Sequence, residues 1–168
     1  MGPQDTPAAP RPPLDSSNDS CGSPLVESQL WYSLDGKVVG IQDGSTVELI
    51  AAKDRRRVTI HLVGIAVGPA ETEDAKGHVS SLVLNKRVAV LVNTQWLSQK
   101  KKPAEVTGVV HLSRGSPTDV GLSLLTAGLA RTEKPRPYSM SNYTFCKYRE
   151  AESKARSERL GIWQWVNE

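Results

Sequence analysis

The chain has 168 residues, of which 38% are hydrophobic and 23% are charged, and its formal net charge is +3. These values are ordinary for one soluble globular domain with or without a tail, and a weakly basic balance is compatible with nucleic acid without indicating it. No apolar run approaches the roughly 20 residues that a membrane-spanning helix needs. The N-terminus also lacks the layout of a signal peptide. We therefore expect an intracellular protein, of the cytoplasm or the nucleus, with no membrane partner.

The two cysteines, Cys21 and Cys146, are too few for a disulfide framework. No Cys-x-x-Cys pair or Cys/His cluster indicates a zinc site. Isolated cysteines of this kind are typical of a reducing compartment. We accordingly predict no bound metal and no cofactor.

The N-terminal segment differs in composition from the rest of the chain. Residues 1–24 contain six of the eleven prolines, among Ser, Asn, Asp and Gly. Such a segment has too little apolar surface to offset the entropy that it would lose on ordering. We expect residues 1–28 to form a disordered tail and residues 29–168 to form the domain. A partner-binding role for the tail is the less favoured alternative.

Short runs rich in β-branched residues follow the tail and are separated by turn residues. They cover residues 31–41, 46–51, 57–65, 87–93 and 106–112. Runs of this length and composition are typical of β-strands. Asp35-Gly36 and Asp43-Gly44 stand where tight turns are expected, because glycine accepts a positive φ. The first part of the domain is therefore predicted to be a strand meander.

Three segments have helical patterns, at residues 71–85, 119–127 and 143–160. In the first, acidic residues occupy the first turn, and one face carries Ala75, Val79, Leu82 and Val83. The second and third segments are each followed by a glycine that ends the helix, Gly128 and Gly161. Five strands with a helix after the third, followed by two helices, predict a small barrel capped by helices.

Four motifs stand in order along this pattern. They are DGSTVEL at 43–49, VTIHLVGIAVGPAE at 58–71, VGLSLLTAGLA at 120–130 and YREAESKARSERLGIW at 148–163. Together they resemble the staphylococcal nuclease (thermonuclease) family over about residues 33–165. The resemblance implies an OB-type five-stranded β-barrel with three helices, a mainly β fold of the α+β class. Ala151, Ala155, Ile162 and Trp163 have a structural interpretation in that fold, because small residues let a helix lie close to the barrel and large ones cover its core.

The family's reaction is calcium-assisted hydrolysis of phosphodiesters. Carboxylates hold the ion, two arginines neutralise the phosphate, and a Glu handles the attacking water. The resemblance places these roles at Asp43, Ser45, His61, Ala66, Glu71 and Thr107. Only the first and the fifth of these retain a carboxylate, and Glu71 is displaced by extra residues.

Ser45 and Ala66 stand in place of ion-binding carboxylates, and His61 and Thr107 stand in place of the arginines. Each such electrostatic contribution is worth roughly 2–4 kcal/mol in the transition state. Losing all four predicts a vestigial site without calcium-dependent nuclease activity. In the alternative, His61 and His111 lie on neighbouring strands and His61 acts as a general base beside a basic phosphate clamp. We favour the interpretation of both as ordinary strand residues.

Two cationic loops are the remaining functional candidates. One contains Lys53, Arg55, Arg56 and Arg57 at a hairpin tip, and the other contains Lys100, Lys101 and Lys102 between residues 98 and 105. OB-type barrels often bind single strands along a basic groove with stacking aromatic side chains. Basic loops are also routine as solvated surface, and aromatic residues make up only 5% of the chain.

We therefore predict a catalytically inactive module that binds single-stranded nucleic acid, RNA or DNA. The alternative is a protein-interaction or scaffold domain of the same fold. A residual phosphodiesterase with altered chemistry is the least favoured of the three.

Overall fold

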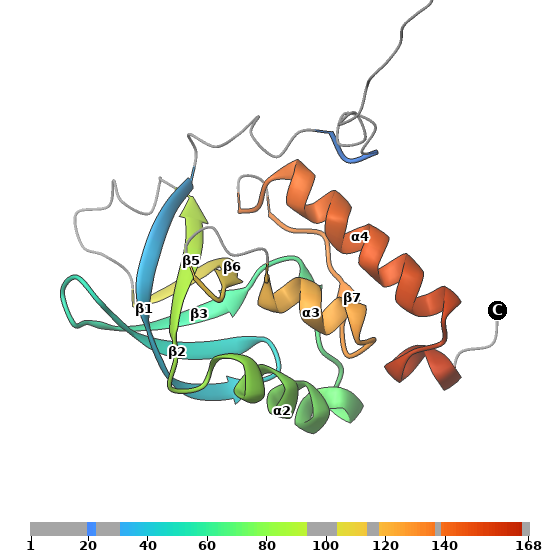
Figure 1. Ribbon diagram of the computed structural model, residues 1–168, viewed down its shortest axis with the longest axis horizontal. Coiled ribbons are helices and arrows are strands. Elements are labelled where there is room, and N and C mark those ends of the chain that lie inside the picture. Colours follow the sequence, from blue (N-terminus) through green and yellow to red (C-terminus); the bar gives the residue numbers. More distant parts are fainter. Residues whose placement is uncertain (1–19, 23–30, 94–103, 114–117, 137–138, 166–168) are drawn as a thin grey trace, which may run out of the picture.

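The computed structural model describes residues 20–22, 31–93, 104–113, 118–136 and 139–165 (Figure 1). Its strands are β1 (Trp31–Asp43), β2 (Thr46–Ala51), β3 (Arg57–Leu62), β4 (Ile65–Ala66), β5 (Arg87–Asn93), β6 (Glu105–His111) and β7 (Arg131–Thr132). Its α-helices are α2 (Thr72–Val83), α3 (Val120–Thr126) and α4 (Asn142–Ser157). Short 3₁₀ turns cover Pro69–Glu71 and Gly161–Trp165.

Five strands close into a barrel in the order β1-β2-β3-β6-β5, with β5 returning to β1. The neighbouring strands are antiparallel except β3 and β6, which run parallel. Helix α2 lies at the lower end of the barrel in Figure 1, and α3 and α4 lie side by side at its right. The predicted five-stranded barrel with three helices, of the α+β class, is confirmed.

The barrel is filled by alternate side chains of its strands, as the two-residue period of a strand requires. Inward residues of β1, β2, β3 and β5 are buried, while the residues between them face outward. The buried set includes Val38, Val47, Leu49, Val58, Ile60, Val90 and Val92. This alternation also fixes which side chains lie on the outer face, where the candidate site is found.

The two predicted turns of the meander have different outcomes. Asp43-Gly44 stands at the tight turn between β1 and β2, as expected. Asp35-Gly36 does not form a turn, because β1 continues through it and Gly36 pairs with both Ala51 and Val88. A Cβ at Gly36 would lie 2.6 Å from the Ile50 carbonyl oxygen, so this glycine permits a close approach of two strands.

The predicted strand 57–65 is interrupted after Leu62. Gly64 has a φ of 81°, and the chain resumes as β4, which pairs with β7 outside the barrel. The glycine therefore redirects the chain toward the helical side of the molecule.

The three predicted helices are present, and each ends one to three residues earlier than predicted. On α2, Ala75, Val79 and Val83 are buried as expected. Helix α3 is followed by Gly128 with a φ of 75°. Helix α4 was predicted to reach residue 160 but ends at Ser157, because Arg159 already adopts a positive φ of 55° two residues before Gly161.

Cys21 and Cys146 form a disulfide, across 125 residues of sequence. Two cysteines are too few for a disulfide framework, but here they form a single bond, so the inference of a reducing compartment loses its support. Cys146 lies on α4, so the bond fixes residues 20–22 to this helix. Residues 1–19 and 23–28 of the predicted tail lie outside the described residues. Within the described part of the chain, no helix has the length and apolar character needed to traverse a bilayer.

Candidate functional site

The turn between β1 and β2 is held by its own acidic residue. The Asp43 carboxylate accepts hydrogen bonds from the Ser45 backbone N–H at 2.8 Å and from the Ser45 hydroxyl at 3.2 Å. Gly44 is buried at the centre of the turn, where an added Cβ would lie 2.5 Å from the Ala75 Cβ and 3.2 Å from a Val67 methyl. The turn therefore packs on apolar groups of α2 and of the segment after β4, and Asp43 serves to close it.

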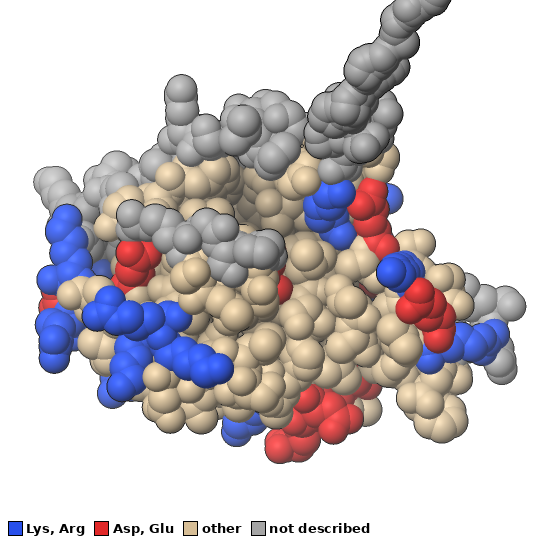
Figure 2. Space-filling view, in the orientation of Figure 1, with Lys and Arg blue, Asp and Glu red and all other residues tan. Residues whose placement is uncertain are grey.

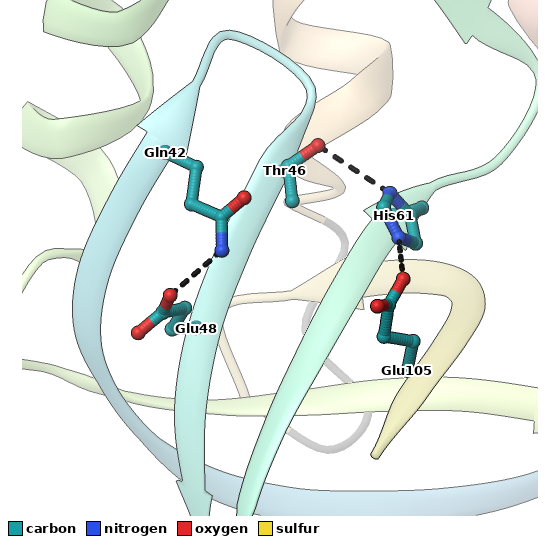
Figure 3. A network of polar contacts seen from close by, with 5 residues as sticks. All are labelled: Gln42, Thr46, Glu48, His61 and Glu105. Atoms are coloured by element: carbon teal, nitrogen blue, oxygen red, sulfur yellow. Dashed lines mark hydrogen bonds and ion pairs between the residues drawn. The ribbon is translucent and has the colours of Figure 1, made fainter. Parts of the chain in front are cut away.

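His61 projects outward from β3 and is held at both ring nitrogens (Figure 3). Its Nε2 lies 2.9 Å from a Glu105 carboxylate oxygen, and its Nδ1 lies 3.5 Å from the Thr46 hydroxyl. The His61 and Glu105 side chains are 45% and 69% exposed. The imidazole and carboxylate thus form an accessible polar pair across the parallel β3–β6 junction, beside Thr107, which is the register partner of His61.

His111 does not join this pair. It lies on β6, the neighbour of β3, but four residues beyond Thr107 along the strand. At roughly 3.3 Å per residue the two histidines are about 13 Å apart along the sheet. The two-histidine arrangement considered from the sequence is therefore not assembled.

Glu71 is engaged with a basic residue that follows α3. A carboxylate oxygen of Glu71 lies 3.6 Å from an Arg131 guanidinium nitrogen, and the Glu71 side chain is only 17% exposed. The same guanidinium lies over the ring of Trp163, 5.4 Å from its centroid. Arg131 is also the register partner of Ala66 in the β4–β7 pair. The β4–β7 pairing therefore brings a guanidinium to Glu71 and places it beside Ala66.

A pocket of about 470 Å³ adjoins the His61–Glu105 pair. One wall comes from β3 and β6, with Thr107 among its residues, and the other comes from the segment after β7. That segment contributes Glu133, Lys134 and Arg136 to the lining. The pocket thus combines two carboxylates with two cations and a histidine, which is not the uniformly positive lining that a phosphate would select.

Residues 70–165 match the family described as staphylococcal nuclease homologue. The chain belongs to the staphylococcal nuclease family. No curated protein matches the chain closely enough to count as a relative. The family match begins at Ala70, so α2, α3, α4 and the strands between them carry it, and the β1–β2 turn and His61 precede it.

Three of the positions to which the sequence resemblance assigns the family's reaction lie near one another in this fold. Ser45, His61 and Thr107 are connected through neighbouring strands, because Thr46 pairs with His61 and His61 pairs with Thr107. The Ser45 carbonyl also accepts a hydrogen bond from the Leu62 backbone N–H at 2.8 Å. Among the described residues, these positions supply no group of three close His, Cys, Asp or Glu ligand atoms of the kind that holds a metal ion.

A row of basic side chains crosses the outer face of the barrel. Lys37 of β1 is the register partner of Arg87 on β5 and of Ile50 on β2, and Ile50 is in turn the partner of Arg57 on β3. Arg87, Lys37 and Arg57 are all exposed. Neighbouring strands lie about 4.8 Å apart, so this cationic row spans four strands of the barrel. Figure 2 shows Lys and Arg side chains gathered at the lower left of the molecule, where β1, β2 and β5 lie.

The predicted hairpin tip extends this row but is partly neutralised. Lys53 and Arg55 are exposed in the connection between β2 and β3. Arg57 is bound to a Glu48 carboxylate at 2.8 Å, and Arg56 lies 3.6 Å from Asp54. Hydrogen bonds from Gln42 and Arg57 lower the pKa of Glu48, so this carboxylate stays ionised. The second predicted loop, with Lys100, Lys101 and Lys102, lies outside the described residues.

Sequence reasoning did not identify Lys37 and Arg87 as members of the cationic row. It also did not identify Glu105 as the partner of His61 or Arg131 as the partner of Glu71. Lys37 and Arg87 are 50 residues apart, and only the β1–β5 register brings them together. The sequence of β1 nevertheless indicates that residue 37 faces outward. Side chains alternate along a strand, so assigning Leu34 and Val38 to the core places residue 37 on the outer face. For Glu105 and Arg131 the partners depend on the parallel β3–β6 junction and on the β4–β7 pair, which local patterns do not reveal.

Proposed function

We propose that this domain binds single-stranded nucleic acid on the outer face of its barrel and does not cleave it. The observation that carries the proposal is the cationic row of Arg87, Lys37 and Arg57, with Lys53 and Arg55 beside it. Cations along a sheet surface attract a phosphate backbone by releasing its condensed counterions. Glu48 offsets one charge of the row, and the surface remains positive.

Binding at this surface depends on charge more than on base identity. Ile50 is the central side chain of the row, and two aromatic side chains of the described part of the chain, Tyr32 and Tyr143, are engaged elsewhere. Tyr32 packs against the core, and Tyr143 of α4 lies under the Lys147 ammonium, 5.6 Å from its ring centroid. With Ile50 as the only apolar member of the row, we expect similar affinity for different base sequences and a strong dependence on salt.

The lack of cleavage follows from the substituted reaction positions. The two remaining carboxylates are each occupied, Asp43 by the turn that it closes and Glu71 by Arg131. The groups at Ser45 and Ala66 offer no carboxylate for a hard divalent cation. His61 is paired with the Glu105 carboxylate, so an acidic group lies at the place where the family uses an arginine.

The proposed binding of nucleic acid is tested by fluorescence anisotropy of labelled single-stranded DNA and RNA at several salt concentrations. The full chain is compared with the double variant Lys37→Ala/Arg87→Ala. Each lost phosphate contact reduces the slope of log affinity against log salt by about 0.7 for a single strand. We expect the double variant to bind more weakly and to lose up to about 1.4 of that slope.

Arg149→Ala/Lys154→Ala is the matched control, because it removes the same charge from exposed positions on α4. It should retain the wild-type slope. Equal affinity and slope for wild type and Lys37→Ala/Arg87→Ala would reject the cationic row as the binding surface.

The proposed absence of cleavage is tested by incubating the full chain with single-stranded DNA and RNA, once with calcium and once with a chelator. Intact substrate under both conditions is the expected result. Cleavage that the chelator abolishes would overturn it.

A protein-interaction role is the second candidate, and an exposed tryptophan favours it. Trp165, the last residue of the 3₁₀ turn, is 80% exposed, and Leu160, which precedes this turn, is 37% exposed. Trp165 borders a pocket of about 410 Å³ that also contains Glu71 and Asp74. Large exposed aromatic side chains are enriched where proteins bind one another. Oligonucleotide binding that is absent at low salt would favour this candidate over the first.

A further inference from the structure

Cys21, Cys146 and Glu150 form a cluster beside α4, away from the cationic row. Their two sulfur atoms and a Glu150 carboxylate oxygen all lie within 4.8 Å of one another. Cys146 and Glu150 are four residues apart on α4, so the helix presents them on one side. Cys21 reaches the same point through the described segment 20–22. Cysteine thiolates and carboxylate oxygens are both ligands that zinc takes in proteins.

We propose that, when the disulfide is reduced, Cys21, Cys146 and Glu150 bind a zinc ion. Zinc is held at about 2.3 Å by a thiolate and about 2.0–2.2 Å by a carboxylate oxygen, in tetrahedral geometry. Those lengths place two sulfurs roughly 3.8 Å apart and a sulfur and an oxygen roughly 3.5 Å apart. The three ligand atoms already lie within 4.8 Å, and the two Cα atoms are 5.5 Å apart. Side-chain rotation therefore suffices to separate the sulfurs and admit the ion.

The carboxylate is positioned before the ion arrives. One Glu150 oxygen accepts a hydrogen bond from the Ser20 hydroxyl at 2.5 Å, and the other lies 3.4 Å from the Lys147 ammonium. The Ser20 contact ties the carboxylate to the segment that carries Cys21, so all three ligands remain together. Hydrogen bonds to a ligating carboxylate orient it and support metal affinity. The positive charge of the Lys147 ammonium repels the ion, but the three negative charges of two thiolates and one carboxylate attract it more strongly.

The reaction that makes the site is thiol–disulfide exchange. A reducing dithiol transfers two electrons and two protons to the Cys21–Cys146 bond, which breaks to give two thiols while the dithiol becomes a disulfide. Zinc then displaces one proton from each thiol as the two sulfur bonds form. Three protein ligands leave a fourth position for water. The N-terminal segment is consequently joined to α4 in both states, by a disulfide when oxidised and by the metal when reduced.

The test uses the full chain, reduced with a phosphine and kept free of oxygen, with zinc measured by competition against a chromophoric chelator. We expect one zinc per reduced chain and none bound at this site in the oxidised chain. Cobalt in place of zinc should give the near-ultraviolet thiolate absorption. Cys146→Ser should lose at least a hundredfold in affinity, and Glu150→Gln about tenfold.

Glu158→Gln removes an exposed carboxylate beyond the end of the same helix and should bind zinc as the wild type does. A second measurement needs no variant. Zinc should protect both cysteines of the reduced wild type from alkylation, counted by mass spectrometry. Equally tight zinc binding by Cys21→Ser/Cys146→Ser, or alkylation at the same rate with and without zinc, would overturn the proposal.

Discussion

The Tyr148 hydroxyl is shared between the two carboxylate oxygens of Asp119, at 2.7 and 2.9 Å. Tyr148 belongs to α4 and Asp119 caps the N-terminus of α3, where its carboxylate also accepts the Leu122 backbone N–H at 3.2 Å. The two residues are only 1% and 5% exposed. This buried contact joins the two helices that cover one side of the barrel.

The substitution Tyr148→Phe should destabilise the domain by about 1–3 kcal/mol, because it leaves a buried carboxylate without its hydroxyl donor. Burial raises the pKa of Asp119, and the Tyr148 hydrogen bond partly opposes that rise. The loss should therefore be smaller at acidic pH, where Asp119 takes up a proton and no longer carries a buried charge. Urea denaturation of the wild type and of Tyr148→Phe at several pH values measures this difference in the free energy of unfolding.

The same contact predicts the alkaline behaviour of the wild type. Burial and the neighbouring Asp119 raise the pKa of Tyr148 well above its usual value of 10.0. Because the folded-state pKa is the higher one, the unfolded chain loses this proton first, and stability decreases as pH rises above about 10. Tyr148→Phe should have a shallower alkaline decline than the wild type. Identical slopes for the two proteins would contradict this.

Gly161→Ala should destabilise the domain by about 2–4 kcal/mol. Gly161 has a φ of 53°, and an added Cβ would overlap the Gly128 carbonyl oxygen, which itself accepts the Ile162 backbone N–H at 2.8 Å. Gly77→Ala is the matched control, since its Cβ would meet nothing within 4 Å on an exposed part of α2. The Gly77→Ala control should instead stabilise the domain by about 0.5–1 kcal/mol. Thermal unfolding of both variants tests the contrast.

His78 predicts a loss of stability on mild acidification. Its Nε2 lies 2.7 Å from the Ser123 hydroxyl, between α2 and α3, and burial lowers its pKa from 6.5. The unfolded chain therefore binds this proton first, so the free energy of unfolding decreases as pH falls below about 6.5. His78→Gln should lose less stability than the wild type between pH 7 and pH 5. A histidine NMR titration would show directly whether the His78 ring titrates below its usual value.

Restoring the family's reaction groups should restore calcium binding first and DNA cleavage second. Ser45→Asp with Ala66→Asp is expected to bind calcium without cleaving DNA. Adding His61→Arg and Thr107→Arg should then produce calcium-dependent cleavage, with about a hundredfold or more contributed by each arginine. Calorimetry and a gel assay follow the two stages. Calcium binding that is already equal in the wild type would refute the assignment of positions 45 and 66.

The sequence was sufficient to predict the barrel but not the surface that the barrel creates. Alternating apolar residues have one physical interpretation in a strand, so β2 and β5 were predicted with their observed bounds. Asp35-Gly36 was misread because the same dipeptide suits a turn and a close strand contact. The Cys21–Cys146 bond and the Lys37–Arg87 pair join residues distant in sequence. The Lys37–Arg87 pair follows from closure of the barrel and the disulfide from the position of segment 20–22 against α4, and no local pattern encodes either pairing.

Closure of the barrel also sets the order in which this chain can fold. One edge of β1 pairs with β2 across a two-residue turn. Its other edge pairs with β5, which begins 44 residues after β1 ends. The parallel β3–β6 junction spans a similar distance. Long loops lose more entropy on closing than short ones, so chains rich in such contacts cross a high barrier. The β1–β2–β3 meander is therefore expected to form early, and a nascent chain remains an open sheet with two unpaired edges until His111 has been synthesised.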